Sequence, residues 1–108
     1  MVILFSEEEK GVYNATESGD LKRLKVLLET REDKNPVIYE SSDGIRSTIL
    51  HEAARKGKVN IIKWYHETLH INDINPLDST GISTPMMWAA QEGELNVTQY
   101  YIEAVQGG

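Results

Sequence analysis

Apolar residues recur with helical spacing in three stretches of the chain, and each stretch follows a glycine. After Gly19 the apolar positions follow the i, i+3, i+4, i+7 pattern of an amphipathic helix. Similar spacing follows Gly57 and Gly93. The residues expected to line these helices are Leu21, Leu24, Val26, Leu27 and Leu28, then Val59, Ile61, Ile62 and Tyr65, then Leu95, Val97, Tyr101 and Ile102. The pattern predicts three helices, each beginning just after a glycine.

Another helix is predicted before each of these glycines. Ser6 precedes three glutamates, which favours a capped helix over residues 7–18. Thr48 can cap a helix that runs to about residue 56, and Thr84 can cap one that has Pro85 at its first position. Since glycine readily adopts positive φ, it can end each of these helices. The chain therefore predicts three helical hairpins.

Two of the hairpins begin with the same motif. Residues 48–57 (TILHEAARKG) and 84–93 (TPMMWAAQEG) both open on Thr, carry Ala-Ala five residues later and close on Gly, and residues 15–19 are a weaker copy. The three glycines are 38 and 36 residues apart. A repeat of nearly constant period indicates a solenoid, in which neighbouring units bury each other's apolar faces. We expect one domain over residues 1–108, with repeats at about 6–40, 41–77 and 78–106.

The repeated motif resembles the ankyrin repeat. Thr-Pro-x-x-x-Ala-Ala-x-x-Gly in the third unit is preceded by Ile74, Asn75, Asp78 and Gly81, as in that family, and the second unit has Thr48-x-Leu50-His51. The resemblance implies an all-α solenoid of three stacked helix-turn-helix repeats, with hairpin-like fingers formed by connections 31–47 and 70–83. It also implies structural hydrogen bonds for His51. Family repeats have about 33 residues, so these connections are longer than usual.

By resemblance, the function is that of a non-enzymatic interaction module, without a cofactor, that binds a protein or peptide on its concave side. Repeat phase places Trp88 there, although a core position for Trp88 stays open. Exposed, Trp88 would anchor an extended peptide through an apolar or basic residue. The expected binding residues are Asn14, Glu17, Glu52, Arg55, Lys56, Trp88, Gln91 and Glu92 on the helices, with Asp43, Arg46, Asp78 and Ser83 at the finger tips.

Charge and composition narrow the choice of partner and compartment. Residues 1–63 contain all 11 Lys and Arg and are neutral overall, so the net charge of −6 comes from residues 64–108. A chain without a basic excess is poorly suited to bind a phosphate backbone, so we expect no nucleic-acid partner. The apolar run 2–5 is too short for a signal peptide or membrane span. With no cysteine, we expect an intracellular, cytoplasmic protein without membrane insertion.

One short motif suggests chemistry. Residues 66–70 read His-Glu-x-x-His, which on a helix can place two imidazoles on a zinc ion with the glutamate as base. Counted from Gly57, as in the other repeats, the motif falls at the end of a helix, where His66 and His70 need not share a face. A small zinc-dependent hydrolase remains the alternative from another class. A further alternative is a regulatory ankyrin part of a larger lipid-handling or membrane enzyme.

The last predicted helix carries many apolar residues for the end of a stack. They are Leu95, Val97, Tyr100, Tyr101, Ile102 and Val105. Terminal repeats need a polar outer face to stay soluble. We therefore expect self-association or further repeats at the C-terminal end.

Overall fold

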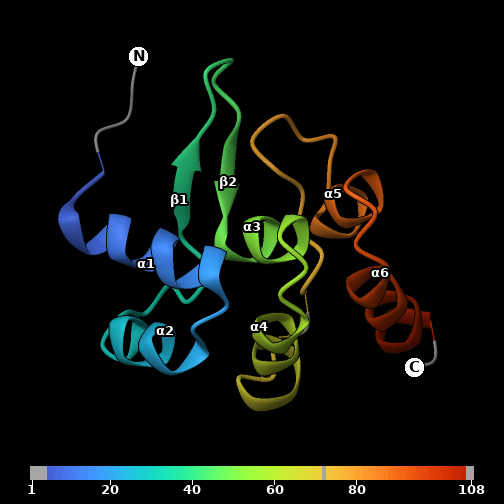
Figure 1. The fold of residues 1–108 in the computed structure, drawn as a ribbon, viewed down its shortest axis with the longest axis horizontal. Coiled ribbons are helices and arrows are strands. Elements are labelled where there is room, and N and C mark those ends of the chain that lie inside the picture. Colours follow the sequence, from blue (N-terminus) through green and yellow to red (C-terminus); the bar gives the residue numbers. More distant parts are fainter. Residues whose placement is uncertain (1–4, 72, 107–108) are drawn as a thin grey trace.

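The computed structural model describes residues 5–71 and 73–106, which form three successive helix pairs (Figure 1). In Figure 1 the first helices of the pairs form one row and the second helices lie below them, and α3 packs against both α1 and α5. The pairs are α1 (Glu7–Ser18) with α2 (Leu21–Leu28), α3 (Ile49–Arg55) with α4 (Val59–Lys63), and α5 (Pro85–Gln91) with α6 (Leu95–Tyr101). The helices α4 and α6 continue as the π-helical turns η1 (Trp64–Thr68) and η2 (Ile102–Gln106). The three predicted helical hairpins are confirmed.

Local sequence explains where the helices begin and end. The Ser6 hydroxyl accepts a hydrogen bond from the Glu9 amide and the Glu9 carboxylate accepts one from the Ser6 amide, which is a complete capping box. Thr48 and Thr84 cap α3 and α5 as predicted. The hairpin glycines have positive φ angles of 75° at Gly19, 74° at Gly57 and 73° at Gly93. Residues that carry a side chain rarely adopt such φ angles, so glycine suits these turns.

The two connections between helix pairs have different structures. In the first, β1 (Val37–Glu40) pairs antiparallel with β2 (Arg46–Thr48), so this finger is a two-stranded ribbon that projects from the row of helices (Figure 1). Residues 73–83 of the second contain turns but no strand. The Arg46 amide donates a hydrogen bond of 2.8 Å to the Ser79 hydroxyl and joins the two fingers. The first finger is thus the hairpin that was expected, and its short sheet corrects the all-α description of an otherwise helical chain.

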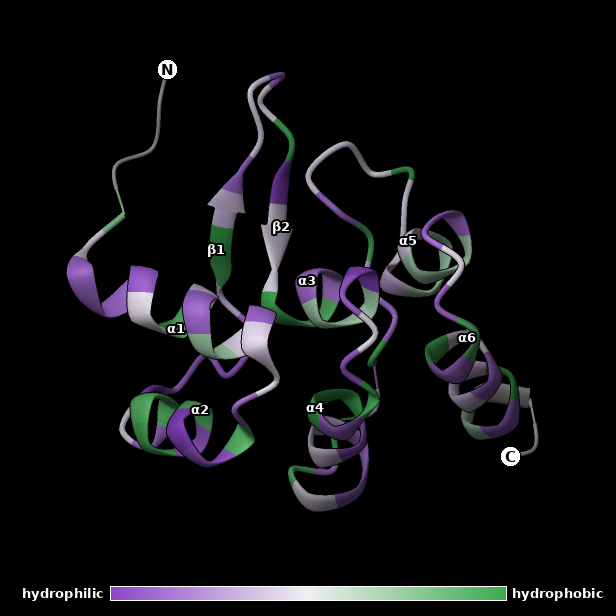
Figure 2. Cartoon of the chain, in the orientation of Figure 1, coloured by the Kyte–Doolittle hydropathy of each residue, from purple (hydrophilic) through white to green (hydrophobic). Residues whose placement is uncertain are grey.

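The core lies between the helix pairs and contains the predicted apolar positions of the first two repeats except Val26, which is 66% exposed. Figure 2 shows apolar residues on both helix rows and on β1. Ala53 and Ala54 of α3 are fully buried, and such small side chains allow close approach of the neighbouring helices. In the last helix Val97 and Tyr101 are buried, but Leu95 is 78% exposed and Ile102 40%. The exposed Leu95 and Ile102 agree with the expectation that the last helix presents apolar residues on its outer face, because the described residues include no helix pair beyond α6 to cover them.

Equivalent side chains join successive repeats across the second helices. Three residues after the hairpin glycine, Asn60 and Asn96 donate hydrogen bonds of 3.1 Å to the carbonyls of Gly19 and Gly57, each in the preceding repeat. In addition, the Lys25 ammonium lies 5.9 Å from the Trp64 ring centre, and that of Lys63 lies 5.7 Å from the ring centre of Tyr100. These cation–π contacts and amide hydrogen bonds therefore recur with the period of the repeat.

A second recurring contact fixes the start of each connection. The Asn35 side-chain oxygen accepts a hydrogen bond from the Leu50 amide at 3.0 Å, and that of Asn75 accepts one from the Met86 amide at 3.0 Å. The buried hydroxyls of Tyr65 and Tyr101 donate to the carbonyls of the residues just before these asparagines, Lys34 and Ile74. Each connection is therefore tied to both helices of the pair that follows it.

Candidate functional site

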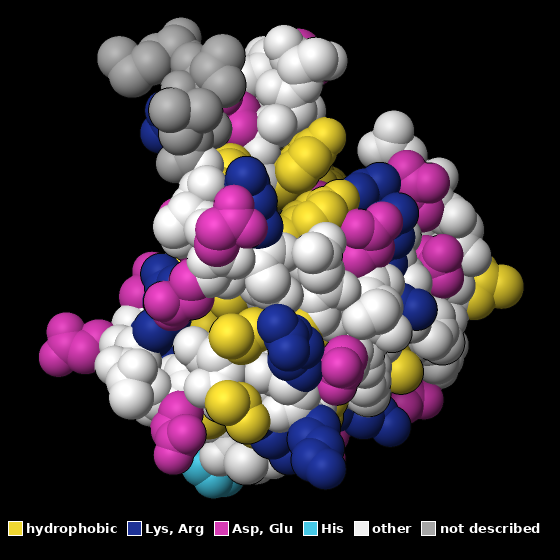
Figure 3. All heavy atoms as spheres, turned by 60° about the vertical axis from the view of Figure 1, so that its left-hand side comes forward, with side chains coloured by type: hydrophobic (Ala, Val, Ile, Leu, Met, Phe, Trp, Pro, Cys, Tyr) yellow, Lys and Arg dark blue, Asp and Glu magenta, His cyan; other side chains and the backbone are white. Residues whose placement is uncertain are grey.

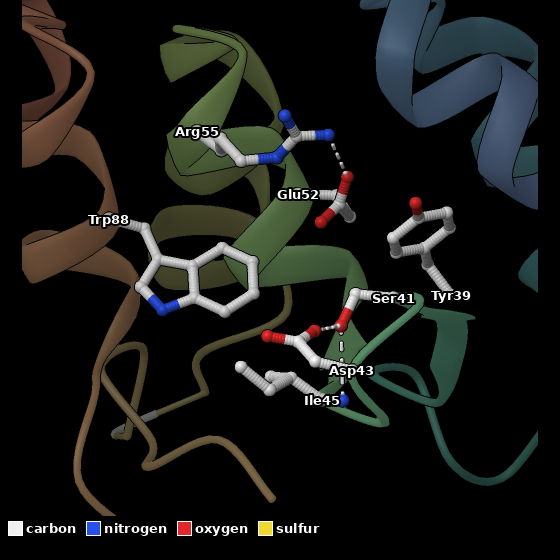
Figure 4. A pocket seen from close by; sticks show the side chains of 7 residues that line it. All are labelled: Tyr39, Ser41, Asp43, Ile45, Glu52, Arg55 and Trp88. Carbon is white, nitrogen blue, oxygen red and sulfur yellow. Dashed lines mark hydrogen bonds and ion pairs between the residues drawn. The ribbon is translucent and has the colours of Figure 1, made fainter. Parts of the chain in front are cut away.

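Two neighbouring pockets lie where the fingers meet the first helices. The first, of about 280 Å³, is lined by Tyr39, Ser41, Asp43, Ile45, Glu52, Arg55 and Trp88 (Figure 4). The second, of about 320 Å³, is lined by Ile45, Arg55, Asp78, Thr80, Ile82, Ser83, Trp88 and Gln91. Because Ile45, Arg55 and Trp88 line both, the two pockets form one groove, called the Trp88 groove below. Figure 3 shows hydrophobic side chains at the base of the projecting finger, with charged side chains around them.

Trp88 is held in the groove by its helix and by His51. Thr84 and Pro85 set the start of α5, which places Trp88 in the first turns of that helix. The indole is partly buried and meets the His51 imidazole edge-on, with ring centres 5.0 Å apart and ring planes at 61°. Such edge contacts orient aromatic rings. Trp88 is thus neither a fully buried core residue nor a fully exposed one.

His51 connects α3 to the second finger. Its Nδ1 lies 2.8 Å from the Thr48 hydroxyl, and its Nε2 lies 3.4 Å from the Ser83 carbonyl. A carbonyl can only accept, so this geometry assigns the proton to Nε2. Burial lowers the pKa of His51, against the opposing effect of the hydrogen bond to Ser83. The imidazole is neutral at pH 7, and the structural hydrogen bonds expected of His51 are present.

Glu52 and Arg55 form the wall of the first pocket on α3. Glu52 is only 1% exposed, and its carboxylate accepts hydrogen bonds from the Ser47 hydroxyl at 3.0 Å and the Arg55 guanidinium at 2.7 Å. The hydrogen bond from Arg55 to Glu52 raises the pKa of Arg55. A guanidinium has five N–H groups, and Arg55 lines both pockets. Arg55 therefore neutralises the buried carboxylate and retains further donors along the groove.

Tyr39 lies across the first pocket from Trp88 (Figure 4). Its ring stacks on Tyr13 of α1, with centres 5.3 Å apart and planes at 18°. The neighbouring residue Ile38 is buried, and successive side chains of a strand point to opposite faces. Strand alternation therefore turns Tyr39 out of the core and toward the groove, where Tyr13 supports it.

The structure brings most of the predicted finger and helix residues into the groove. The members that line it are Asp43, Glu52, Arg55, Asp78, Ser83, Trp88 and Gln91. Five predicted residues do not line either pocket: Asn14, Glu17, Arg46, Lys56 and Glu92. Of these, Glu17 and Lys56 form an ion pair of 3.2 Å, and Arg46 pairs with Glu40 at 3.2 Å.

Several groove residues were not predicted from the sequence: Tyr39, Ser41, Ile45, Thr80 and Ile82. All of them lie in the connections between helix pairs, where repeat phase gives no register. The apolar run Val37-Ile38-Tyr39 held a usable signal, because a strand with Ile38 buried must expose Tyr39 on its other face.

The His-Glu-x-x-His motif makes a packing contact. Residues His66 and Glu67 lie in η1, and both bond to the Tyr100 hydroxyl of α6, at 2.8 Å and 3.1 Å. His70 lies beyond the helix with a φ of 54°. Within residues 5–71 and 73–106 no three His, Cys, Asp or Glu side chains are grouped so that they could hold a metal ion. The zinc-hydrolase alternative has no support in this geometry.

Comparison with known families identifies the chain. The family model for ankyrin repeats, in three copies, matches residues 12–106. The chain therefore belongs to the ankyrin repeat family, whose members are generally protein-interaction modules. No curated protein matched the chain. Among the described helices, none combines the length and the apolar composition that crossing a bilayer requires.

Proposed function

We propose that this chain is a three-repeat solenoid that binds an extended segment of a partner protein in the Trp88 groove, and that it has no catalytic role of its own. One observation carries the proposal. The two pockets share Ile45, Arg55 and Trp88, so a continuous groove runs between the two fingers and the first helices α3 and α5. A groove with two adjoining pockets suits a peptide that places one side chain in each.

The lining of the groove supplies both contact area and hydrogen bonding. Trp88 offers a large, partly exposed ring, and buried tryptophans are frequent anchors of protein interfaces. The remaining N–H groups of Arg55 and the side-chain amide of Gln91 can bond to peptide carbonyls along the second pocket. The self-association expected at the C-terminal end would use a different surface, the exposed Leu95 and Ile102 of the last repeat.

Selection from a phage-displayed library of random linear peptides tests this function. Peptides selected on the wild-type protein are synthesised, and their affinities for variants are measured by fluorescence polarisation. We expect Trp88→Ala to weaken binding by about 30-fold, which corresponds to roughly 2 kcal/mol. Met87→Ala is the matched control, because Met87 lies on the same helix, is 55% exposed and lines neither pocket.

A second variant covers the case in which Trp88→Ala weakens the fold. Gln91→Lys leaves the core untouched, because Gln91 is exposed, and places a longer, charged side chain in the second pocket. It should weaken the same peptides while circular dichroism and thermal melting stay as in the wild type. The proposal is wrong if folded Trp88→Ala and Gln91→Lys proteins bind the selected peptides as tightly as the wild type does.

A further inference from the structure

The two pockets of the Trp88 groove differ in their chemistry, and this difference bears on which peptide binds. The first pocket has aromatic rings on opposite sides, Tyr39 and Trp88 (Figure 4). Each ring is supported from outside the pocket, Tyr39 by stacking on Tyr13 and Trp88 by the edge of His51. The faces of such rings attract cations through their quadrupole, and the tryptophan face does so most strongly.

The charges around the first pocket also favour a cation. Two carboxylates, Asp43 and Glu52, line it against the single guanidinium of Arg55. Arg55 is bound to Glu52 at 2.7 Å. Asp43 accepts a hydrogen bond from the Ser41 hydroxyl, and within the described residues no Lys or Arg pairs with it. One carboxylate at the mouth of the pocket is therefore left without a counter-charge.

Nearby cations do not compensate Asp43, because they are engaged elsewhere. Arg46, at the start of β2, pairs with Glu40 at 3.2 Å. Lys56, at the end of α3, pairs with Glu17 at 3.2 Å. A positively charged side chain that enters the first pocket would thus meet an unneutralised carboxylate and two aromatic rings.

The second pocket has a different lining. Ile45, Ile82 and Trp88 give it three apolar walls, and Ile82 is 72% exposed. Its one carboxylate, Asp78, is occupied by the turn that it starts, since it accepts hydrogen bonds from the Thr80 amide at 3.0 Å and the Thr80 hydroxyl. An apolar ligand side chain would bury Ile82 and the indole, which is favourable in proportion to the area removed from water.

We propose that the first pocket, between Tyr39 and Trp88, binds a lysine or arginine side chain of the partner segment, and that the second pocket, beside Ile82, binds an apolar side chain of the same segment. This assignment rests on the proposed peptide-binding function. It makes the partner a segment in which a basic and an apolar residue lie on either side of the Trp88 ring. Asp43 then determines the preference for charge, and the indole contributes to both pockets.

Peptides from the library selection test the assignment directly. We expect the selected sequences to be enriched in lysine or arginine next to an apolar residue. Replacing the basic residue of a selected peptide by norleucine, which keeps the length but removes the charge, should weaken binding about 3- to 30-fold. Asp43→Asn should weaken the original peptide about threefold and leave the norleucine peptide unaffected.

A charge swap and a matched control sharpen the result. Asp43→Lys should prefer the peptide in which the basic residue is replaced by glutamate. Glu29→Gln is the control for Asp43→Asn, because Glu29 is an exposed acid at the end of α2, outside both pockets, and both substitutions remove one negative charge. The Glu29→Gln protein should bind the original peptide as tightly as the wild type does.

The possible failures can be told apart. If the selected peptides depend on Trp88 but show no basic residue, or bind Asp43→Asn and wild type equally, the basic pocket is refuted and the proposed function stands. If no selected peptide depends on Trp88 or Gln91, the proposed function itself is refuted, and the assignment of both pockets with it.

Discussion

The helices α3 and α5 carry the same motif, yet they differ sharply in burial. Residues 49–54 of α3 are all buried, whereas in α5 only Pro85 and Ala89 are. The two helices are capped alike, by Thr48 and Thr84, and end at equivalent glycines. Each packs against the second helix of its own pair and against the other, but α3 also packs against α1 and β2. The motif determines the helix, and the position in the stack determines how much of it is buried.

The two fingers extend the same comparison. In the first, β1 and β2 pair, Ile38 is buried and Tyr39 stacks on Tyr13 of α1. In the second, the Asp78 side chain and backbone organise a turn with Thr80 and Ser83, and Ile82 remains exposed. The first finger therefore packs side chains against the preceding repeat, whereas the second is organised by its own turn and joined to the preceding repeat by the hydrogen bonds of Ser79 with Arg46 and of Ser83 with His51.

The largest difference in stability is expected between alanine variants at Leu50 and at its counterpart Met86. Both residues lie two positions after the capping threonine of their helix. Leu50 is fully buried, so Leu50→Ala should reduce the free energy of unfolding by about 2–5 kcal/mol. Met86 is only partly buried, and Met86→Ala should cost roughly 1 kcal/mol. Urea unfolding followed by circular dichroism measures both. Equal losses would show that the two repeats are buried to the same extent.

Replacing a small side chain by a larger one tests the alanine pairs. Ala54 is fully buried beside the neighbouring helices, so Ala54→Leu should overpack the core and cost about 1–3 kcal/mol. Its counterpart Ala90 is exposed, and Ala90→Leu should stay within about 0.5 kcal/mol of the wild type. Thermal unfolding of the two variants provides the comparison. A destabilised Ala90→Leu protein would mean that something covers α5 in solution.

The smallest expected effect is a change of stability with pH. It distinguishes the second repeat from the third, since the second has the buried His51 at the position where the third has the exposed Met87. Burial lowers the pKa of His51 below its ordinary value of 6.5. Below pH 6.5 the unfolded chain therefore binds more protons than the folded one, and stability should fall as the pH is lowered from 7.5 to 5.5. The lowered pKa values of Glu9 and Asp78 act only at more acidic pH.

Urea midpoints at both pH values measure this dependence. His51→Gln should show a weaker dependence on pH in this range than the wild type does. A wild-type protein that is equally stable at pH 7.5 and 5.5 would contradict a buried, neutral His51.

Local chemistry made the helices and their ends predictable. Ser6, Thr48 and Thr84 cap helices, and the glycines between paired helices have positive φ, because these roles depend on a few adjacent residues. Burial at the end of the stack could not be obtained from periodicity alone, since Leu95 has the spacing of a core residue and lacks a neighbour.

The groove was predictable only in part, for the same reason. Repeat phase located Trp88 and Arg55, which sit on helices with a shared register. It did not locate Tyr39 or Ile45, because the fingers differ in length and structure. Glu52 shows the limit of repeat phase most clearly: it occupies the same place in the motif as Trp88, yet it is buried by its own arginine and serine partners.

The contacts between repeats also bear on how such a chain can grow. Asn60 reaches back to the Gly19 carbonyl and Lys63 lies over the ring of Tyr100, so the middle repeat gives and receives the same contacts at its two sides. A tandem duplication of residues 41–77 would place a new asparagine at the Gly57 carbonyl and a new lysine at Tyr100. Both junctions would repeat contacts that already exist. Gene duplication could therefore lengthen this array without any new interface having to evolve.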